Sequence, residues 1–169
     1  MEVLLSLTLI PLAVIVYQDF KFRAISWYLP PLIFMLLGGA ILYEEGLQPF
    51  WENLFFNSIF ILLNLIIVLL YFSLKQKKLI NIFQSHLGLG DILFFFSLSP
   101  IFAPINFMIF FVICLLIIIV FSILYLFKTK STNQSIPLAG WMSIQFSIVL
   151  IFDIAFPQTF LLKSVPWLF

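Results

Sequence analysis

Two long stretches of the chain, residues 54–74 and 105–127, contain no charged side chain and consist mainly of Leu, Ile, Val and Phe. A helix of about 20 such residues is long enough to cross the hydrocarbon core of a bilayer. The composition matches, because 64% of the 169 residues are hydrophobic and only 9% are charged, whereas about 25% are charged in a typical soluble domain. The sequence therefore predicts an integral membrane protein.

Weaker apolar stretches complete a pattern of six predicted membrane helices. In chain order the predicted spans are Val3–Gln18, Trp27–Tyr43, Leu54–Leu74, Leu87–Phe102, Ile105–Phe127 and Ile136–Phe156. The first and fourth are short, and helices of that length cross a membrane only where an end is recessed in the protein. We expect an all-α membrane protein with six transmembrane helices, built as a single domain of residues 1–169 and surrounded by the lipid bilayer.

Basic and acidic residues alternate between the predicted connections. The connections after the first, third and fifth spans contain every basic residue except Lys163, namely Lys21, Arg23, Lys75, Lys77, Lys78, Lys128 and Lys130. The opposite side carries glutamates, namely Glu2, Glu44, Glu45 and Glu52. Because connections rich in Lys and Arg stay in the cytoplasm, this pattern predicts that both termini face outward.

The small number of charged and metal-binding side chains excludes several function classes. A formal net charge of +1 provides no basic surface for nucleic acid. Cys114 is the single cysteine, which excludes a disulfide framework and a cysteine-rich zinc site. His86 precedes Asp91 by five residues, but one histidine and two aspartates make a poor zinc ligand set. We expect no metal, no cofactor and no nucleic-acid partner.

Two aspartates fall on the side of the membrane that otherwise carries basic residues. Asp19 closes the first predicted span, and Asp91 lies about one turn inside the fourth, just after Gly88 and Gly90. A charge in the hydrocarbon core costs about 2.5–3.5 kcal/mol or more, so an intramembrane acid indicates a functional site. The structural alternatives are that Asp19 marks the membrane boundary and that Asp91 caps a flexible helix start.

A pair of aspartates at similar depth suggests acid–base chemistry. Two carboxylates a few ångströms apart cannot both ionise, so they share one proton. The ionised member takes a proton from a water molecule that attacks a carbonyl carbon, while the neutral member donates its proton to the carbonyl oxygen. This is the mechanism of aspartic proteases, which needs neither a metal nor a covalent intermediate.

The motifs around these aspartates resemble those of one protease family. Gly88-Leu89-Gly90-Asp91 resembles the GxGD signature of intramembrane aspartyl proteases. The stretch from Asp19 resembles the first-aspartate motif of the type IV prepilin peptidase and preflagellin peptidase family, with agreement at Asp19, Lys21, Arg23, Ile25, Ser26 and Leu29. The opening of the last helix in that family is similar to the segment Ser135-Ile136-Pro137-Leu138-Ala139-Gly140. The likeness covers nearly the whole chain.

The resemblance implies that the two aspartates are catalytic and are supported by the motif residues Gly88, Gly90, Lys21 and Arg23. It also implies a bacterial inner-membrane enzyme whose active site faces the cytoplasm. Its substrate would be a membrane-inserted precursor, pilin-like or pseudopilin-like, that loses a short basic leader, typically after glycine. No connection is long enough for the extra cytoplasmic domain of the bifunctional members, so methyltransferase activity is not expected.

The chain departs from the family pattern at two positions that bear on substrate binding. Trp27 stands where the family has asparagine after the first motif, and Leu93 stands where it has lysine after the second aspartate. Intramembrane acids also mark ion pathways. Two alternatives to a peptidase are therefore a small ion- or proton-coupled transporter that uses Asp19 and Asp91, and a catalytically silent relative that acts as an assembly partner.

Other residues inside the predicted spans lead to structural expectations. Asp153, near the outer end of the sixth span, is expected to be an exposed interfacial carboxylate. Asn64, in the middle of the third span, is expected to form a hydrogen bond to another helix. The pair Gly38-Gly39 in the second span is expected to permit close contact between helices.

Overall fold

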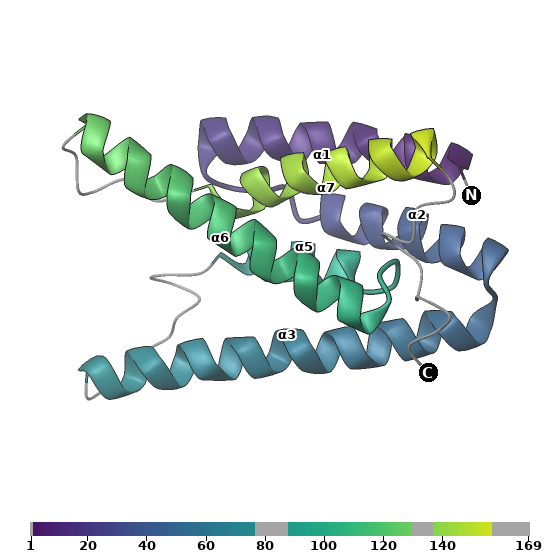
Figure 1. Cartoon of the computed structure of the whole chain (residues 1–169), viewed down its shortest axis with the longest axis horizontal. Helices are drawn as coiled ribbons and strands as arrows, with labels where there is room; N and C mark the ends of the chain where they lie inside the picture. The colour runs from purple at the N-terminus through teal and green to yellow at the C-terminus, as the bar shows by residue number, and fades with distance from the viewer. Residues whose placement is uncertain (1, 77–87, 130–136, 157–169) are drawn as a thin grey trace.

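The structure is a computed structural model that describes residues 2–76, 88–129 and 137–156 (Figure 1). Every regular element in these residues is a helix. The six helices are α1 (Glu2–Phe22), α2 (Leu29–Glu44), α3 (Leu47–Gln76), α5 (Leu89–Leu98), α6 (Pro104–Thr129) and α7 (Leu138–Ala155). The all-α prediction is confirmed for the described part of the chain.

Four of these helices, α1, α3, α6 and α7, are long and apolar enough to cross a membrane. This agrees with the prediction of a membrane-embedded protein. The other two are shorter than the expected spans, because α2 begins at Leu29, two residues after the predicted start, and α5 covers only Leu89–Leu98. Gly46, whose φ of 91° favours glycine, follows the end of α2. The 16 residues of α2 and the 10 residues of α5 correspond to about 24 Å and about 15 Å at about 1.5 Å per residue. By length and composition, four of the described helices are therefore candidate membrane spans, and α2 and α5 are shorter apolar helices.

The helices form a bundle with α1 and α7 packed together along one edge and α3 along the opposite edge, in the view of Figure 1. The main partner of α7 is α1, and the main partner of α5 is α2. The C-terminal ends of α1, α3 and α6 all lie at the left of Figure 1. Because Lys21 and Lys75 belong to the last turns of α1 and α3, two of the predicted basic connections begin at the same end of the bundle.

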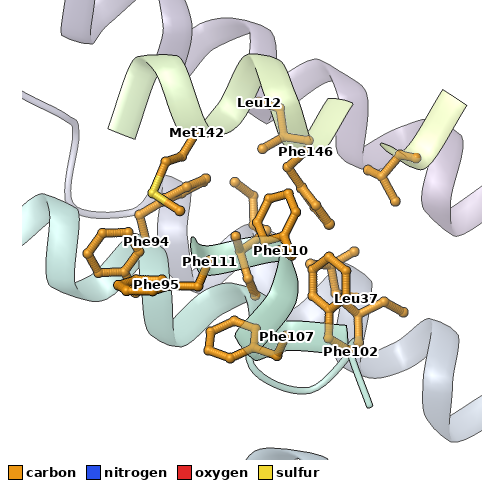
Figure 2. Close-up of a cluster of buried hydrophobic side chains, with 14 of the residues drawn as sticks. Leu12, Leu37, Phe94, Phe95, Phe102, Phe107, Phe110, Phe111, Met142 and Phe146 are labelled. Carbon is orange, nitrogen blue, oxygen red and sulfur yellow. The ribbon is translucent and has the colours of Figure 1, made fainter. Parts of the chain in front are cut away.

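Phenylalanine rings fill the core where α5 and α6 meet α7 (Figure 2). Phe102, in the turn between α5 and α6, stacks on Phe110 with ring centres 4.9 Å apart and lies 5.5 Å from Phe146 of α7. Ring contacts of this kind contribute about 0.5–1.5 kcal/mol per pair beyond the burial of their area. They hold the turn and the start of α6 against α7.

Asp153 is buried, which corrects the prediction of an exposed interfacial carboxylate. The buried residues of α7 recur at intervals of mostly three or four positions, as Ala139, Met142, Ser143, Phe146, Leu150 and Asp153. This spacing defines one face of a helix. Asp153 therefore enters the interior on the same face that buries Phe146.

Asn64 forms its hydrogen bond within α3, so the prediction of a bond to another helix is wrong. Its Nδ2 donates to the backbone oxygen of Phe60, one turn earlier, at 2.8 Å. Interhelical bonds are made instead by Asn53 and Asn57 of the same helix, whose amides reach the turn between α5 and α6. The two kinds of asparagine cannot be told apart by residue type or by hydropathy.

The close helix contact expected at the glycine pair occurs at Gly38. A Cβ atom there would lie 3.0 Å from Cε2 of Phe50, whereas a Cβ atom at Gly39 would lie 3.9 Å from its nearest neighbour, Leu4. We expect Gly38→Val to lower the free energy of unfolding by about 1–3 kcal/mol through overpacking, and Gly39→Val to lower it less. Denaturant titration of both variants in detergent, followed by circular dichroism, measures the difference. Equal destabilisation would contradict the difference in packing at the two positions, because both variants make the same change in intrinsic helix propensity.

Candidate functional site

Asp19 lies on the buried face of α1, about one turn before the helix ends. The residues of that face recur mostly every three or four positions, as Leu5, Thr8, Leu12, Ile15 and Asp19. Because α1 continues to Phe22, Asp19 lies inside the helix and not at its end. Only 5% of its surface is exposed. A buried carboxylate needs hydrogen-bond donors close by.

One such donor comes from the first turn of α7. The backbone N–H of Gly140 donates to Asp19 Oδ2, with an N–O distance of 2.6 Å. The first N–H groups of a helix have no partner within the helix, and Pro137 at the N-cap makes no side-chain hydrogen bond to them. Asp19 therefore supplies from α1 the acceptor that a capping side chain would otherwise supply.

Glycine at position 140 permits this close approach of α1 to α7. A Cβ atom there would lie 2.9 Å from two ring carbons of Phe20 and 3.1 Å from Asp19 Oδ2. A larger residue would therefore displace the Phe20 ring or the carboxylate. The Phe20 ring contacts Trp141, with ring centres 5.6 Å apart, but 42% of its surface is exposed, whereas only 5% of that of Asp19 is exposed. The ring can therefore move outward more easily than the carboxylate.

Asp91 lies in the first turn of α5 and contacts two helix starts. α5 follows Gly88, which is extended and makes no side-chain cap. The Asp91 carboxylate accepts hydrogen bonds from the backbone N–H groups of Gly88 and Ala139. The bond to Gly88 is half of a capping box, in which the third helical residue reaches back to the N-cap. Asp91 thus does cap α5, as the structural alternative supposed, and it also reaches α7.

The two carboxylates meet at the N-terminus of α7. Ala139 and Gly140 are consecutive residues, and their N–H groups donate to Asp91 and Asp19 respectively. The carboxylates are close enough to interact electrostatically. Because a helix N-terminus carries a partial positive charge that favours anions, α7 offsets part of their mutual repulsion. The structure therefore brings together the two aspartates that the sequence singled out.

The two sequence motifs are also in contact beside the carboxylates. A Cβ atom at Gly90 would lie 3.3 Å from Cβ of Ile25, so the GxGD segment lies directly against the end of the first-aspartate motif. Gln18 steadies this segment, because its Oε1 accepts a hydrogen bond from the backbone N–H of Ser26 at 2.8 Å. Gly88, the N-cap residue of α5, and Gly90, in its first turn, thus border the site.

The two basic residues of the first motif have different surroundings. Lys21 is exposed, and its Nζ donates to the Tyr17 hydroxyl oxygen at 2.6 Å and lies about 5 Å from the ring centres of Tyr17 and Phe22. Arg23 has a φ of 54°, a left-handed conformation that ends helices and is uncommon outside glycine. Arg23 interacts electrostatically with Asp19. Of the two, Arg23 is the residue whose charge acts on the carboxylate pair.

The two departures from the family pattern lie at the surface. Trp27 has 76% of its surface exposed, and Leu93 has 42% exposed. Trp27 contacts the ring of Tyr28 edge-on. Both residues are therefore free to contact lipid or a substrate, while the buried carboxylate geometry is formed by other residues.

Sequence reasoning singled out the segment Ser135–Gly140 without revealing what it does. The structure describes its residues 137–140, and the backbone N–H groups, not the side chains, make the contacts with the aspartates. Residues 135 and 136 lie outside the described part. Every residue except proline has a backbone N–H group, so the sequence does not mark which of them act as donors. The sequence signal at this site is a glycine in the first turn of a helix that directly follows a proline.

Among the residues that the structure describes, the aspartate pair is not accompanied by a cluster of metal ligands. No group of three or more His, Cys, Asp or Glu side chains within the described ranges is arranged to hold a metal ion, and His86 lies outside those ranges. Comparisons with models of known protein families, with curated proteins and with solved structures give no match. The functional interpretation therefore depends on the motifs and on the geometry around the two aspartates.

Proposed function

We propose that this protein is an intramembrane aspartic endopeptidase of the prepilin peptidase type, with Asp19 and Asp91 as its catalytic residues. The observation that carries the proposal is the meeting of two carboxylates, from α1 and α5, at consecutive N–H groups of α7. If Asp19 or Asp91 had a purely structural role, the second carboxylate would not be needed beside it. Like charges at close range favour a shared proton, and a shared proton is what hydrolysis by paired aspartates uses.

In this proposal one carboxylate is ionised and the other carries the shared proton. The ionised group removes a proton from a water molecule, whose oxygen attacks the carbonyl carbon of the scissile peptide bond. The neutral group donates its proton to the carbonyl oxygen, which gives a tetrahedral intermediate. The proton taken from water then passes to the leaving nitrogen as the C–N bond breaks. The N–H groups of Ala139 and Gly140 hold the carboxylates in position for these transfers.

The dyad is proposed to face the cytoplasm of a bacterium, with both termini on the outer side of its inner membrane. The support is that α1 ends at the same end of the bundle as α3 and α6 (Figure 1), and that Lys21 and Lys75 lie in the last turns of α1 and α3. Basic connections stay in the cytoplasm. Other basic residues that support this orientation in the sequence, Lys77, Lys78 and Lys130, lie outside the described ranges.

The proposed substrate is a pilin-like or pseudopilin-like precursor with an apolar membrane helix and a short basic leader. The resemblance of the two motifs supports this substrate class. The position of Asp19 supports it as well, because the residue lies about one turn inside the end of a spanning helix. That depth is also where the junction between leader and helix of a membrane-inserted precursor would lie, close to the water of the interface.

Co-expression with a panel of such precursors, in a host that lacks an enzyme of this kind, tests the proposal. We expect at least one precursor to lose the mass of its leader, with mass spectrometry placing the cut at the junction between leader and apolar helix. A panel that stays intact while the chain is folded in the membrane would contradict the proposal. Ion or proton flux into vesicles that contain the chain would then favour the transporter alternative.

A further inference from the structure

Asp91 lies in the first turn of α5, a short helix whose other end leads into a buried turn. With 10 residues, α5 is about 15 Å long at about 1.5 Å per residue, about half of a bilayer core of about 30 Å. The residues that end α5 and form its turn to α6, 97–103, are all buried. The chain therefore reverses inside the protein at this point, where free backbone carbonyls need donors.

Two asparagines of α3 provide those donors. Asn57 Nδ2 donates to the backbone oxygens of Ser99 and Phe102, both at 2.8 Å, and Asn53 Nδ2 donates to that of Pro100 at 3.2 Å. Asn53 and Asn57 are one helical turn apart, so they lie on the same face of α3. Both are buried. Two side chains thus satisfy three carbonyl oxygens of one turn.

The amide group of Asn57 acts through its donors. Its Nδ2 group donates two hydrogen bonds, whereas Oδ1 is buried with no partner among the described residues. A buried acceptor without a partner costs stability, so the contribution of this residue comes from the bonds that it donates. Removing the amide would also cost stability at the turn, because the carbonyl oxygens of Ser99 and Phe102 would lose the hydrogen bonds that Asn57 donates to them.

We propose that Asn53 and Asn57 are positioning residues that set the depth of Asp91, so that its carboxylate lies beside that of Asp19. The catalytic part of this inference rests on the proposed peptidase function, while the geometric part does not. A helix moves along its axis as one body, so fixing the C-terminal turn of α5 also fixes its N-terminal turn. Release of the turn lets α5 slide and carries Asp91 away from Ala139.

The contact between Gly90 and Ile25 offers a reporter of this depth that needs no substrate. Their Cβ positions are 3.3 Å apart, close to the about 3.5–4.5 Å found in disulfides. Ile25→Cys and Gly90→Cys are introduced together with Cys114→Ala, which removes the single native cysteine. Both positions are partly exposed, so an added oxidant reaches them in membranes. The rate of disulfide formation then measures how often α5 lies at the depth at which residues 25 and 90 are in contact.

The experiment compares Asn57→Leu with Asn64→Leu in this reporter. Leucine has the same branching as asparagine but no donor. Asn64 is the matched control because its amide forms its hydrogen bond within α3. We expect Asn57→Leu to slow the crosslink by about tenfold, which corresponds to about 1.4 kcal/mol, and Asn64→Leu to leave it unchanged. Asn53→Leu, which loses a single longer bond, is expected to slow it less. Circular dichroism and size-exclusion chromatography confirm that each compared variant is folded.

The outcomes separate the positioning role from the peptidase proposal. An unchanged crosslink rate in folded Asn57→Leu would overturn the positioning role, whether or not the chain is a peptidase. In the background without added cysteines, Asn57→Leu is expected to lower kcat for precursor cleavage with little change in KM, and unchanged cleavage would overturn the link to catalysis. No cleavage by the unaltered protein would overturn the proposed function, and the crosslink rates would still decide the geometric part.

Discussion

Asp19→Asn and Asp91→Asn are each expected to reduce precursor cleavage by at least about 10³-fold, because general acid–base catalysis by a positioned side chain contributes about 10²–10⁴-fold. Asparagine is nearly the size of aspartate but cannot ionise or hold the shared proton. Its amide oxygen can still accept the hydrogen bond that Gly140 donates to Asp19, so the fold is expected to persist. Initial rates of leader release, at equal amounts of folded protein, measure the effect.

The double variant separates a shared-proton pair from two independent acids. If the carboxylates act as one unit, removing the second after the first costs little more, since residues of one catalytic unit are strongly non-additive. We therefore expect the double variant to retain about the same residual rate as either single variant. Losses that multiply would show that the two residues contribute separately, against the proposed dyad.

Asp153→Asn is the matched control for these variants. Asp153 is also a buried aspartate, but it lies at the far end of α7 from Gly140. Cleavage by Asp153→Asn is expected to stay close to that of the unaltered protein. A loss as large as that of the dyad variants would mean that removing any buried charge inactivates the protein, and the assignment of Asp19 and Asp91 would lose its support.

Gly140→Ala is expected to reduce cleavage by about tenfold, less than the loss of about 10²-fold that a displacement of about 1 Å causes, because the carboxylate has to shift by only a few tenths of an ångström. The added Cβ atom would lie 2.9 Å from the Phe20 ring and 3.1 Å from Asp19 Oδ2. Phe20 is 42% exposed and its ring can move outward, whereas Asp19 is 5% exposed, so the overlap with the carboxylate is the one that affects cleavage. The same initial-rate assay measures the loss, and kcat is expected to fall more than KM rises.

Gly39→Ala provides the comparison for this substitution. The two variants make the same chemical change inside a helix, but a Cβ atom at Gly39 would meet its nearest neighbour, Leu4 Cδ1, at 3.9 Å. Gly39→Ala is expected to retain full cleavage. If Gly140→Ala retains it too, the N–H of Gly140 does not hold Asp19 in the way the structure describes.

The helices could be predicted from the sequence because long apolar stretches are a strong signal. The predicted spans 105–127 and 136–156 differ from α6 and α7 by no more than two residues at either end. At α3 the prediction began at Leu54, whereas the helix begins at Leu47. Hydropathy marks the apolar part of a helix, and the helix itself continues through polar residues such as Glu52.

The two aspartates could be found because acids are rare in apolar stretches, and the remainder of the site could not. The donors that hold them are backbone N–H groups of Ala139 and Gly140, which no residue type encodes. Asp153 is buried because α7 packs against helices that are far away in the sequence, mainly α1. Local sequence gives no information about such contacts. Local sequence therefore located the carboxylates, while tertiary contacts determine what surrounds them.

Cleavage of a purified precursor by the purified protein in lipid vesicles, in water enriched in ¹⁸O, is the most direct test of the central claim. We expect the unaltered protein to release the leader with ¹⁸O in its new carboxyl group, because water attacks the peptide bond. We expect the double variant Asp19→Asn/Asp91→Asn to release it at least about 10³-fold more slowly. A precursor that stays intact with the unaltered protein, or is cut equally by the double variant, would contradict the central claim.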